Sequence, residues 1–306
     1  MSFVSNSTGS FFNRSLAQMA DLRAGIERAR TQIATGNKIE RGSDDPVAAA
    51  QLRNVARRER LASVEGDNTA RLGQDISSAS QEVEAVKSLL QRARELAVQA
   101  ANTPTGADGR QAIAFELEQL TEELFSRANG TALTGEPLFA GLSSDAAFTR
   151  DAAGNVTYIG TPTSGVVPVA PGTAIERGLP GNEVFEFDLG GTPSSAFAVL
   201  SGLASALNGG SPDPAGAALA AIDGIDAALD TANRAQTILG TRLAWVEQVQ
   251  QQQGTRSIEL AERRSRVGDT DIAEAIARLQ QSLTALEASQ AAFARISSLS
   301  LFNALR

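Results

Sequence analysis

The chain has 306 residues, of which 42% are hydrophobic and only 5% are aromatic. Such a chain can bury a core, but large aromatic side chains are scarce, so we expect long, thin helix contacts and no thick aromatic centre. The formal net charge of -8 argues against nucleic-acid binding, which requires a clustered excess of Lys and Arg. The lack of cysteine and histidine excludes disulfides, Ser-His-Asp triads and His-ligated metal sites.

Nothing in the sequence indicates an enzyme. It contains no catalytic constellation and no phosphate-binding glycine loop, so we expect no catalytic residue, no cofactor and no metal. The N-terminus has no basic segment followed by an apolar stretch, and no apolar run is long enough to cross a bilayer. We therefore expect no membrane insertion and, if the protein is secreted, export without a cleavable signal peptide.

The first predicted helix covers residues 16–33, where apolar residues recur at steps of three and four. This spacing averages about 3.5 residues, the repeat that keeps a narrow seam facing a partner helix. Gly36 follows and supplies the left-handed conformation that ends many helices. In this helix we expect an assembly interface at Leu16, Met19, Leu22, Ile26 and Ile33.

The second predicted helix is long and covers residues 46–102. Ser43-Asp44-Asp45 supplies side-chain oxygens that can cap it, and Pro46 suits its first turn because the missing N–H is not needed there. A break at residues 103–106 precedes a third predicted helix near residues 110–128. The apolar seam of the long helix is expected at Leu72, Ile76, Ala79, Val83, Val86, Leu90, Ala93, Ala97 and Ala100.

The amino-acid composition of the chain changes between residues 130 and 216. Eight of the ten prolines lie there, together with short β-type runs at residues 156–159, 166–167 and 184–187. This composition predicts a small strand-and-turn domain inserted between helices. Its loops are expected to face outwards, and we place it at the far end of a helical hairpin.

Helical periodicity resumes near residue 217 and returns in a last helix at the C-terminal end. Gln290 in that helix is either a polar residue that fixes the register of a seam or a surface glutamine next to it. The remaining positions that we expect in an assembly interface are Ile272, Ile276, Leu279, Leu283, Leu286, Gln290, Phe293, Leu301 and Phe302.

These elements predict a mainly α fold, a long antiparallel helical hairpin or coiled-coil rod with an inserted small β-rich domain. We expect a terminal coiled-coil assembly domain (1–44 and 266–306) and a helical rod domain (45–135 and 215–265). The inserted domain should cover residues 136–214.

Three groups of charged residues are interpreted without a binding role. Asp269 and Asp271 open a helix, where capping of free amides is favoured over a metal site. Asp223, Asp226 and Asp230 share a helix face that we interpret as solvated. The basic run is also interpreted as a solvated helix face, because Glu59 interrupts it and no aromatic residue interleaves; it consists of Arg53, Arg57, Arg58 and Arg60.

Several segments resemble the flagellin-like axial proteins of bacteria. Leu90-Gln-Arg-Ala-Arg-Glu-Leu-Ala-Val-Gln-Ala-Ala-Asn102 is similar to a core segment of flagellins. Ile33-Ala-Thr-Gly-Asn-Lys-Ile39 with Ser43-Asp-Asp-Pro46 resembles the loop after their first helix. The C-terminal matches are Asp269-Thr-Asp-Ile-Ala-Glu-Ala275 and Leu286-Glu-Ala-Ser-Gln290.

Within this family, Pro46, Leu138-Phe-Ala-Gly141 and the ending Ser300-Leu-Phe-Asn-Ala-Leu-Arg306 are similar to the proteins that join hook to filament. Gly42 and Ala304 depart from that pattern, where a proline and an aromatic residue are expected. The alternatives are a filament-forming flagellin and, in another class, a surface adhesin acting through the β-rich domain. Leu301 and Phe302 are the feature that separates the first two.

The resemblance implies a secreted structural subunit of the extracellular bacterial flagellum that self-assembles helically through its terminal helices. It implies copies of the same chain, the hook-side junction protein and flagellin as neighbours. It also implies a type III export route and an export chaperone that covers the apolar C-terminal end.

Overall fold

The protein is described by a computed structural model that covers the backbone of residues 3–102 and 106–304 and the side chains of residues 10–102 and 106–297. The predicted mainly α fold with small β elements is confirmed. The elements follow in the order α1 (Phe3–Thr35), α2 (Pro46–Asn102), α3 (Ala107–Ala128), β1 (Phe148–Arg150), β2 (Val156–Tyr158), β3 (Val166–Ala170), β4 (Thr173–Glu176), α4 (Gly181–Phe185), β5 (Glu186–Leu189), β6 (Thr192–Ser195), α5 (Ala196–Ser205), η1 (Ala206–Gly210), α6 (Pro214–Gly268) and α7 (Ile272–Ala304).

The chain divides into two compact units. Unit 1 contains residues 1–61 and 256–306, and unit 2 contains residues 62–255. The long helices α2 and α6 contribute to both units, because each of them passes through a boundary. The three-part division expected from the sequence remains a prediction.

The ends of the helices follow local chemistry. α1 ends before Gly36, whose φ of 72° is the left-handed conformation that glycine adopts easily. α2 begins at Pro46, and Asp45 Oδ1 accepts hydrogen bonds from the backbone N–H groups of Val47 (3.1 Å) and Ala48 (2.9 Å). α2 extends to Asn102, the predicted last residue, and residues 103–105 of the predicted break lie outside the described residues.

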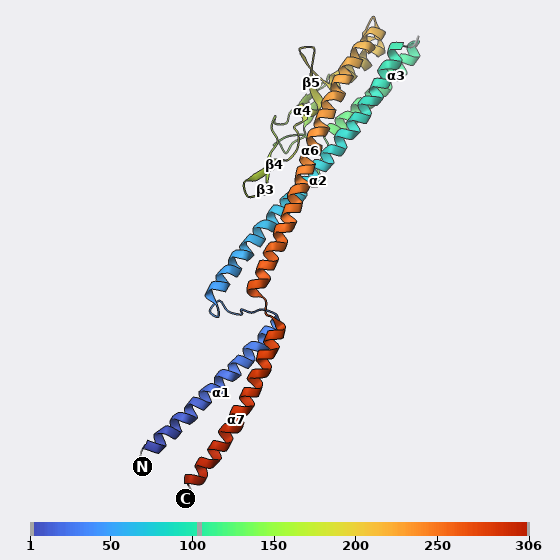
Figure 1. Cartoon of the computed structure of the whole chain (residues 1–306). Helices are drawn as coiled ribbons and strands as arrows, with labels where there is room; N and C mark the ends of the chain where they lie inside the picture. Colours follow the sequence, from blue (N-terminus) through green and yellow to red (C-terminus); the bar gives the residue numbers. More distant parts are fainter. Residues whose placement is uncertain (1–2, 103–105, 305–306) are drawn as a thin grey trace. The chain divides into compact units, whose positions relative to one another are not determined.

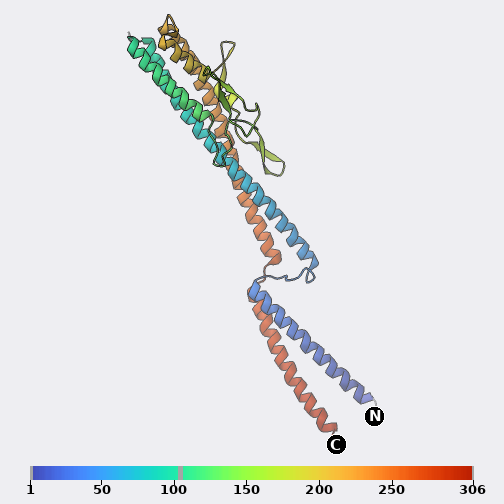
Figure 2. The ribbon, with the colours of Figure 1, turned by 180° about the vertical axis from the view of Figure 1, so that it is seen from behind.

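The core of unit 2 is the seam between α2 and α6, which run side by side in both views (Figure 1, Figure 2). Every predicted seam position of α2 from Leu72 to Ala100 is buried. On α6, Ile225, Ala232, Leu239 and Val246 are buried in the same core, at the spacing of seven that keeps one helix face inward. Because many of these side chains are alanine, the two helices can approach closely.

An aromatic cluster lies under the inserted segment, which corrects the expectation that no aromatic core forms. Phe185 lies 5.5 Å from Phe139 and 5.7 Å from Phe197, measured between ring centroids. Phe148 packs against Phe185 at 5.2 Å and against Phe197 at 5.3 Å. Four of the twelve phenylalanines of the chain thus pack in one place, where edge-to-face and stacked contacts add to apolar burial.

The inserted segment contains three separate antiparallel hairpins, β1 with β2, β3 with β4 and β5 with β6. The predicted β-type runs at residues 156–159 and 166–167 overlap strands β2 and β3. In the third run, Val184 and Phe185 belong to the short helix α4, and strand β5 starts at Glu186. The hairpins lie along the flank of α2 and α6 and not beyond their ends, as the ribbon shows (Figure 1). Helix α5 was not expected in this segment; Ser195 Oγ caps it by accepting from Ala198 N at 3.1 Å.

Candidate assembly surfaces

The predicted interface residues all lie in the sequence of unit 1, where α1 and α7 pack against each other. Met19 and Ile26 of α1 and Ala275 of α7 are buried. The rings of Phe12 and Phe293 meet edge to face with centroids 5.2 Å apart. The predicted positions that are half-buried along this pair of helices are Leu22, Ile33, Leu279, Leu283, Leu286 and Phe293. The terminal heptads therefore find a first partner within the same chain.

A second set of predicted positions lies outside this seam. Leu16 is 53% exposed, Ile272 42% and Ile276 41%, and Gln290 is exposed as well. Ser15, and not Leu16, is half-buried at the step of four before Met19. On α7 the half-buried Ser289 takes the place expected for Gln290, so within one chain Gln290 is a surface glutamine. The side chains of Leu301 and Phe302 lie outside the described residues, although the backbone there continues α7.

We give the name outer strip to three exposed apolar residues, Leu16 on α1 and Ile272 and Ile276 on α7, which lie toward opposite ends of this helix pair. Large apolar side chains scattered singly on a surface need no explanation. Here, however, they flank a seam of only two helices, which covers each helix on one side. The outer strip is therefore the candidate surface for contacts with other chains, and this assignment remains a prediction.

Residues 36–38, after α1, and residues 268–270, between α6 and α7, are joined by backbone hydrogen bonds that we name the backbone clip. No sequence pattern predicted this contact. Lys38 N donates to Gly268 O at 2.7 Å, and Thr270 N donates to Gly36 O at 2.8 Å. Between these bonds, residues 37 and 269 form an antiparallel bridge. The cap expected at Asp271 is present, since its Oδ1 accepts from the N–H groups of residues 273 and 274.

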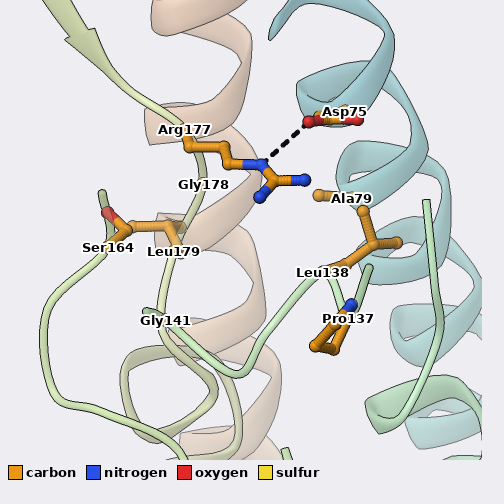
Figure 3. A pocket seen from close by; sticks show the side chains of 9 residues that line it. All are labelled: Asp75, Ala79, Pro137, Leu138, Gly141, Ser164, Arg177, Gly178 and Leu179. Carbon is orange, nitrogen blue, oxygen red and sulfur yellow. Dashed lines mark hydrogen bonds and ion pairs between the residues drawn. The ribbon is translucent and has the colours of Figure 1, made fainter. Parts of the chain in front are cut away.

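In unit 2, arginine side chains fasten the inserted segment to the helices (Figure 3). Arg177 Nε donates to Asp75 Oδ2 of α2 at 2.9 Å, and Arg177 also pairs with Glu136. Arg242 of α6 donates to Gly178 O at 2.6 Å and pairs with Glu176. The cavity beside Arg177 has a volume of about 10 Å³, about enough for one water molecule. It is a packing gap and offers no ligand site.

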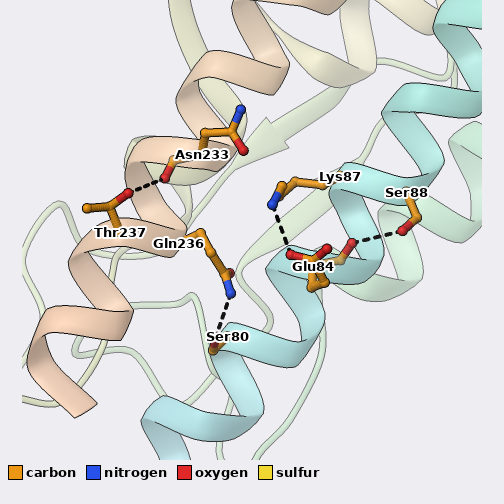
Figure 4. A network of polar contacts seen from close by, with 7 residues as sticks. All are labelled: Ser80, Glu84, Lys87, Ser88, Asn233, Gln236 and Thr237. Atoms are coloured by element: carbon orange, nitrogen blue, oxygen red, sulfur yellow. Dashed lines mark hydrogen bonds and ion pairs between the residues drawn. The ribbon is translucent and has the colours of Figure 1, made fainter. Parts of the chain in front are cut away.

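Polar side chains also cross between α2 and α6. Gln236 Nε2 donates to Ser80 Oγ at 3.0 Å, next to the Lys87–Glu84 pair on α2 (Figure 4). Asp226 pairs with Arg94 of α2, with a shortest distance of 2.6 Å, so one of the three aspartates expected on a solvated face is engaged with the neighbouring helix.

The single tyrosine is structural. Its hydroxyl, at position 158, donates to the backbone oxygens of residues 139 (3.1 Å) and 161 (2.7 Å). Burial raises the pKa of Tyr158, because the charged phenolate loses solvation there. Its neutral hydroxyl is therefore retained as a donor, and Tyr158 offers no exposed aromatic platform for the adhesin alternative.

Comparison with known proteins identifies the relatives of this chain. Residues 7–144 match the bacterial flagellin N-terminal helical region. A flagellar hook-associated protein 3 from Escherichia coli (strain K12) is 25% identical over 312 residues, which cover 97% of this chain and 98% of that protein. The chain is therefore similar to bacterial flagellins in its N-terminal part and to a flagellar hook-associated protein over nearly its whole length.

Solved structures share the fold of this chain. FlgL from Xanthomonas campestris has a TM-score of 0.61 at 19% identity and covers 68% of this chain and 98% of its own. The flagellar junction protein FlgL from Legionella pneumophila has a TM-score of 0.58 at 16% identity and covers 72% of this chain and 100% of its own. No helix within the described residues is long and apolar enough to span a membrane.

A matched pair of substitutions tests which residues lie in the buried α1–α7 seam and which lie in the exposed outer strip. Met19→Asp places an unpaired charge in the buried α1–α7 seam, and we expect it to lower the free energy of unfolding of unit 1 by at least about 2 kcal/mol. Leu16→Asp, one turn away and exposed, should change it by less than about 0.5 kcal/mol. Circular dichroism melting curves of the two full-length variants measure the difference; equal losses would contradict the assignment of Leu16 to the outer strip.

The insert contacts generate a second prediction. Arg177→Met removes the partner of Asp75, whose side chain is only 15% exposed, so docking of the β3–β4 hairpin should weaken by about 1–3 kcal/mol. Hydrogen exchange should become faster in residues 166–179 and stay unchanged in residues 10–35. Arg263→Met, at an exposed position of α6 outside the inserted segment, is the control. Unchanged exchange in the hairpin of the Arg177→Met variant would show that Arg177 does not hold it.

Proposed function

We propose that this chain is a structural subunit that joins the hook of the bacterial flagellum to its filament. The observation that carries the proposal is the similarity to a flagellar hook-associated protein over nearly the whole length of both chains. The Legionella relative is described as a flagellar junction protein, and its fold is shared. The role is passive, because it requires helices to pack and no bond to be made or broken.

In this proposal the α1–α7 pair is the assembling element. Each chain brings a two-helix unit whose inner seam is already covered, and the outer strip stays available to the same unit of neighbouring chains. Ordering a helix costs on the order of 1–2 kcal/mol per residue, and burial on more than one side offsets that cost better than a single seam does. Assembly would therefore stabilise α1 and α7 as well as connect the subunits.

The partners follow from the proposed position in the flagellum. Copies of this chain, the hook-side junction protein and flagellin are the expected neighbours. The protein would be exported without a cleavable signal peptide through the flagellar type III apparatus, with a chaperone on the apolar C-terminal end. A chain without disulfides suits passage in an unfolded form.

A filament-forming flagellin is the second candidate, and the match of residues 7–144 to the flagellin N-terminal region favours it. The two functions differ in where the protein lies. A junction protein occupies a short zone at the base of the filament, whereas a flagellin occupies its whole length.

Antibody labelling of intact flagella in the native bacterium tests the proposal. We expect label only at the filament base, and we expect cells lacking the chain to release flagellin into the medium without retaining filaments. An exchange of the exposed β5–β6 turn, residues 189–192, for another turn of the same length should leave motility intact, because the insert is not the assembling part. Label along the whole filament would favour the flagellin candidate, and loss of motility by the turn exchange alone would favour an adhesin.

A further inference from the structure

The buried seam between α2 and α6 is interrupted next to Leu72 and Val249. Among residues 56–71 of α2, all of which the structure describes, Thr69 has the only buried side chain. On α6, residues 250–259 are also all described, and none of them is buried. A segment with few buried contacts has low local stability, because little burial is lost when it moves. The two helices are therefore weakly held to each other along this stretch.

The large apolar residues of the interrupted stretch do not fill the seam. Leu61 and Val64 of α2 are each 56% exposed, and Ile258 of α6 is 63% exposed. The half-buried positions that continue the seam on α2 include Ala62 and Gly66, which bury little apolar area. Hydrophobic burial, which holds the rest of the α2–α6 pair together, thus contributes little here.

A polar contact marks the end of the tight seam. Gln253 Nε2 donates to Thr69 Oγ1 at 2.9 Å and to Val169 O of β3 at 2.6 Å. The hydroxyl of Thr69 in turn donates to the backbone oxygen of Glu65 at 2.7 Å. A threonine that bonds back to the residue four positions before it slightly destabilises its helix and often bends it. The α2 side of this contact therefore favours a bend.

A glycine without a packing role lies within one turn of this contact on each helix. Gly66 precedes Thr69 by three residues, and Gly254 comes directly after the glutamine that contacts Thr69. A Cβ atom added at either glycine would meet no neighbouring segment within 4 Å. Gly73 differs, because a Cβ there would lie 3.2 Å from Val246, so close packing explains that glycine. Glycine weakens a helix interior, and at residues 66 and 254 no close contact offsets this cost.

We propose that α2 and α6 bend together at these glycines. We name the site the bending zone, defined as residues 62–68 of α2 and residues 250–255 of α6. Both segments belong to unit 2 and lie next to the points in the sequence where unit 1 begins. Bending there leaves the buried seam intact, since the zone itself contains no buried side chain whose contacts would be lost.

A bending zone lets one fold present its two units in more than one direction. Hinges are built from a few residues that absorb the change in backbone angles, and these are often small. In the proposed role the chain contacts two unlike neighbours, the hook-side junction protein and flagellin, and a bend allows the same subunit to fit both. Only this use rests on the proposed function; the bending itself is a property of the free chain.

An open glycine alone does not make a bending point. Gly240 of α6 is equally free of neighbours, but the buried Leu239 and Val246 hold the helix in the seam there. Gly25 of α1 is also open, and the buried Ile26 follows it directly. The bending zone differs because it combines open glycines with missing burial. Gly25 and Gly240 therefore serve as matched controls.

Distance distributions between two spin labels on α2 of the purified protein test the proposal. The chain has no cysteine, so Asn54→Cys with Gln74→Cys places labels at exposed positions on either side of the zone. Arg71→Cys with Gln91→Cys gives a control pair outside the zone, and each pair spans about 30 Å of straight helix. We expect a broader distribution, extended to shorter distances, for the first pair only. Equal widths for the two pairs would overturn the proposal.

Replacement of the glycines is the second arm of the test. Gly66→Ala with Gly254→Ala should narrow the distribution between positions 54 and 74 and slow amide exchange in residues 62–68 about fivefold, as the helix propensities of Gly and Ala predict. Gly25→Ala with Gly240→Ala makes the same change outside the zone and should alter neither quantity. No narrowing in the first variant, or equal narrowing in both, would contradict the bending zone. Because these measurements use the free protein, they fail or succeed independently of where labelling places the chain in the flagellum.

Discussion

The structure depends on seams of small apolar residues at steps of three and four, along which helices from opposite halves of the chain pair. In unit 2 this seam joins α2 to α6, and in unit 1 it joins α1 to α7. Each pairing connects segments far apart in the sequence, so neither helix can bury its apolar face by local folding alone. The inserted segment, the clip at residues 36–38 and 268–270 and the arginine contacts all attach to helices that these seams have already positioned.

The sequence predicts such a seam well where the partner is a single helix. All predicted seam positions from Leu72 to Ala100 on α2 are buried, because the apolar residues at steps of three and four lie on only one face of the helix. It predicts less well at the ends of the chain, where two apolar stripes lie side by side. Leu16 and Ile276 are exposed while the smaller Ser15 and Ala275 face the partner helix, and residue size alone does not disclose which stripe is inside.

The inserted segment shows a different limit. Prolines and glycines predict turns, and three hairpins are present. Helix α5 is not predicted, because its ten residues lie between turn-rich stretches. The aromatic cluster around Phe185 joins residues from several short elements, so it has no sequence period to detect. The clip between residues 37 and 269 is likewise a backbone pairing that no side-chain pattern announces.

The most direct test of this account is whether the two ends of one chain pair with each other in the assembled flagellum. The chain has no cysteine, so Phe12→Cys with Phe293→Cys introduces a unique pair where the two rings now meet. Treatment of assembled flagella with a short bismaleimide should give a single-chain product in which residues 12 and 293 are linked, as it should in the free protein. Linkage found only between different chains would contradict the intrachain seam on which the outer strip and the proposed assembly depend.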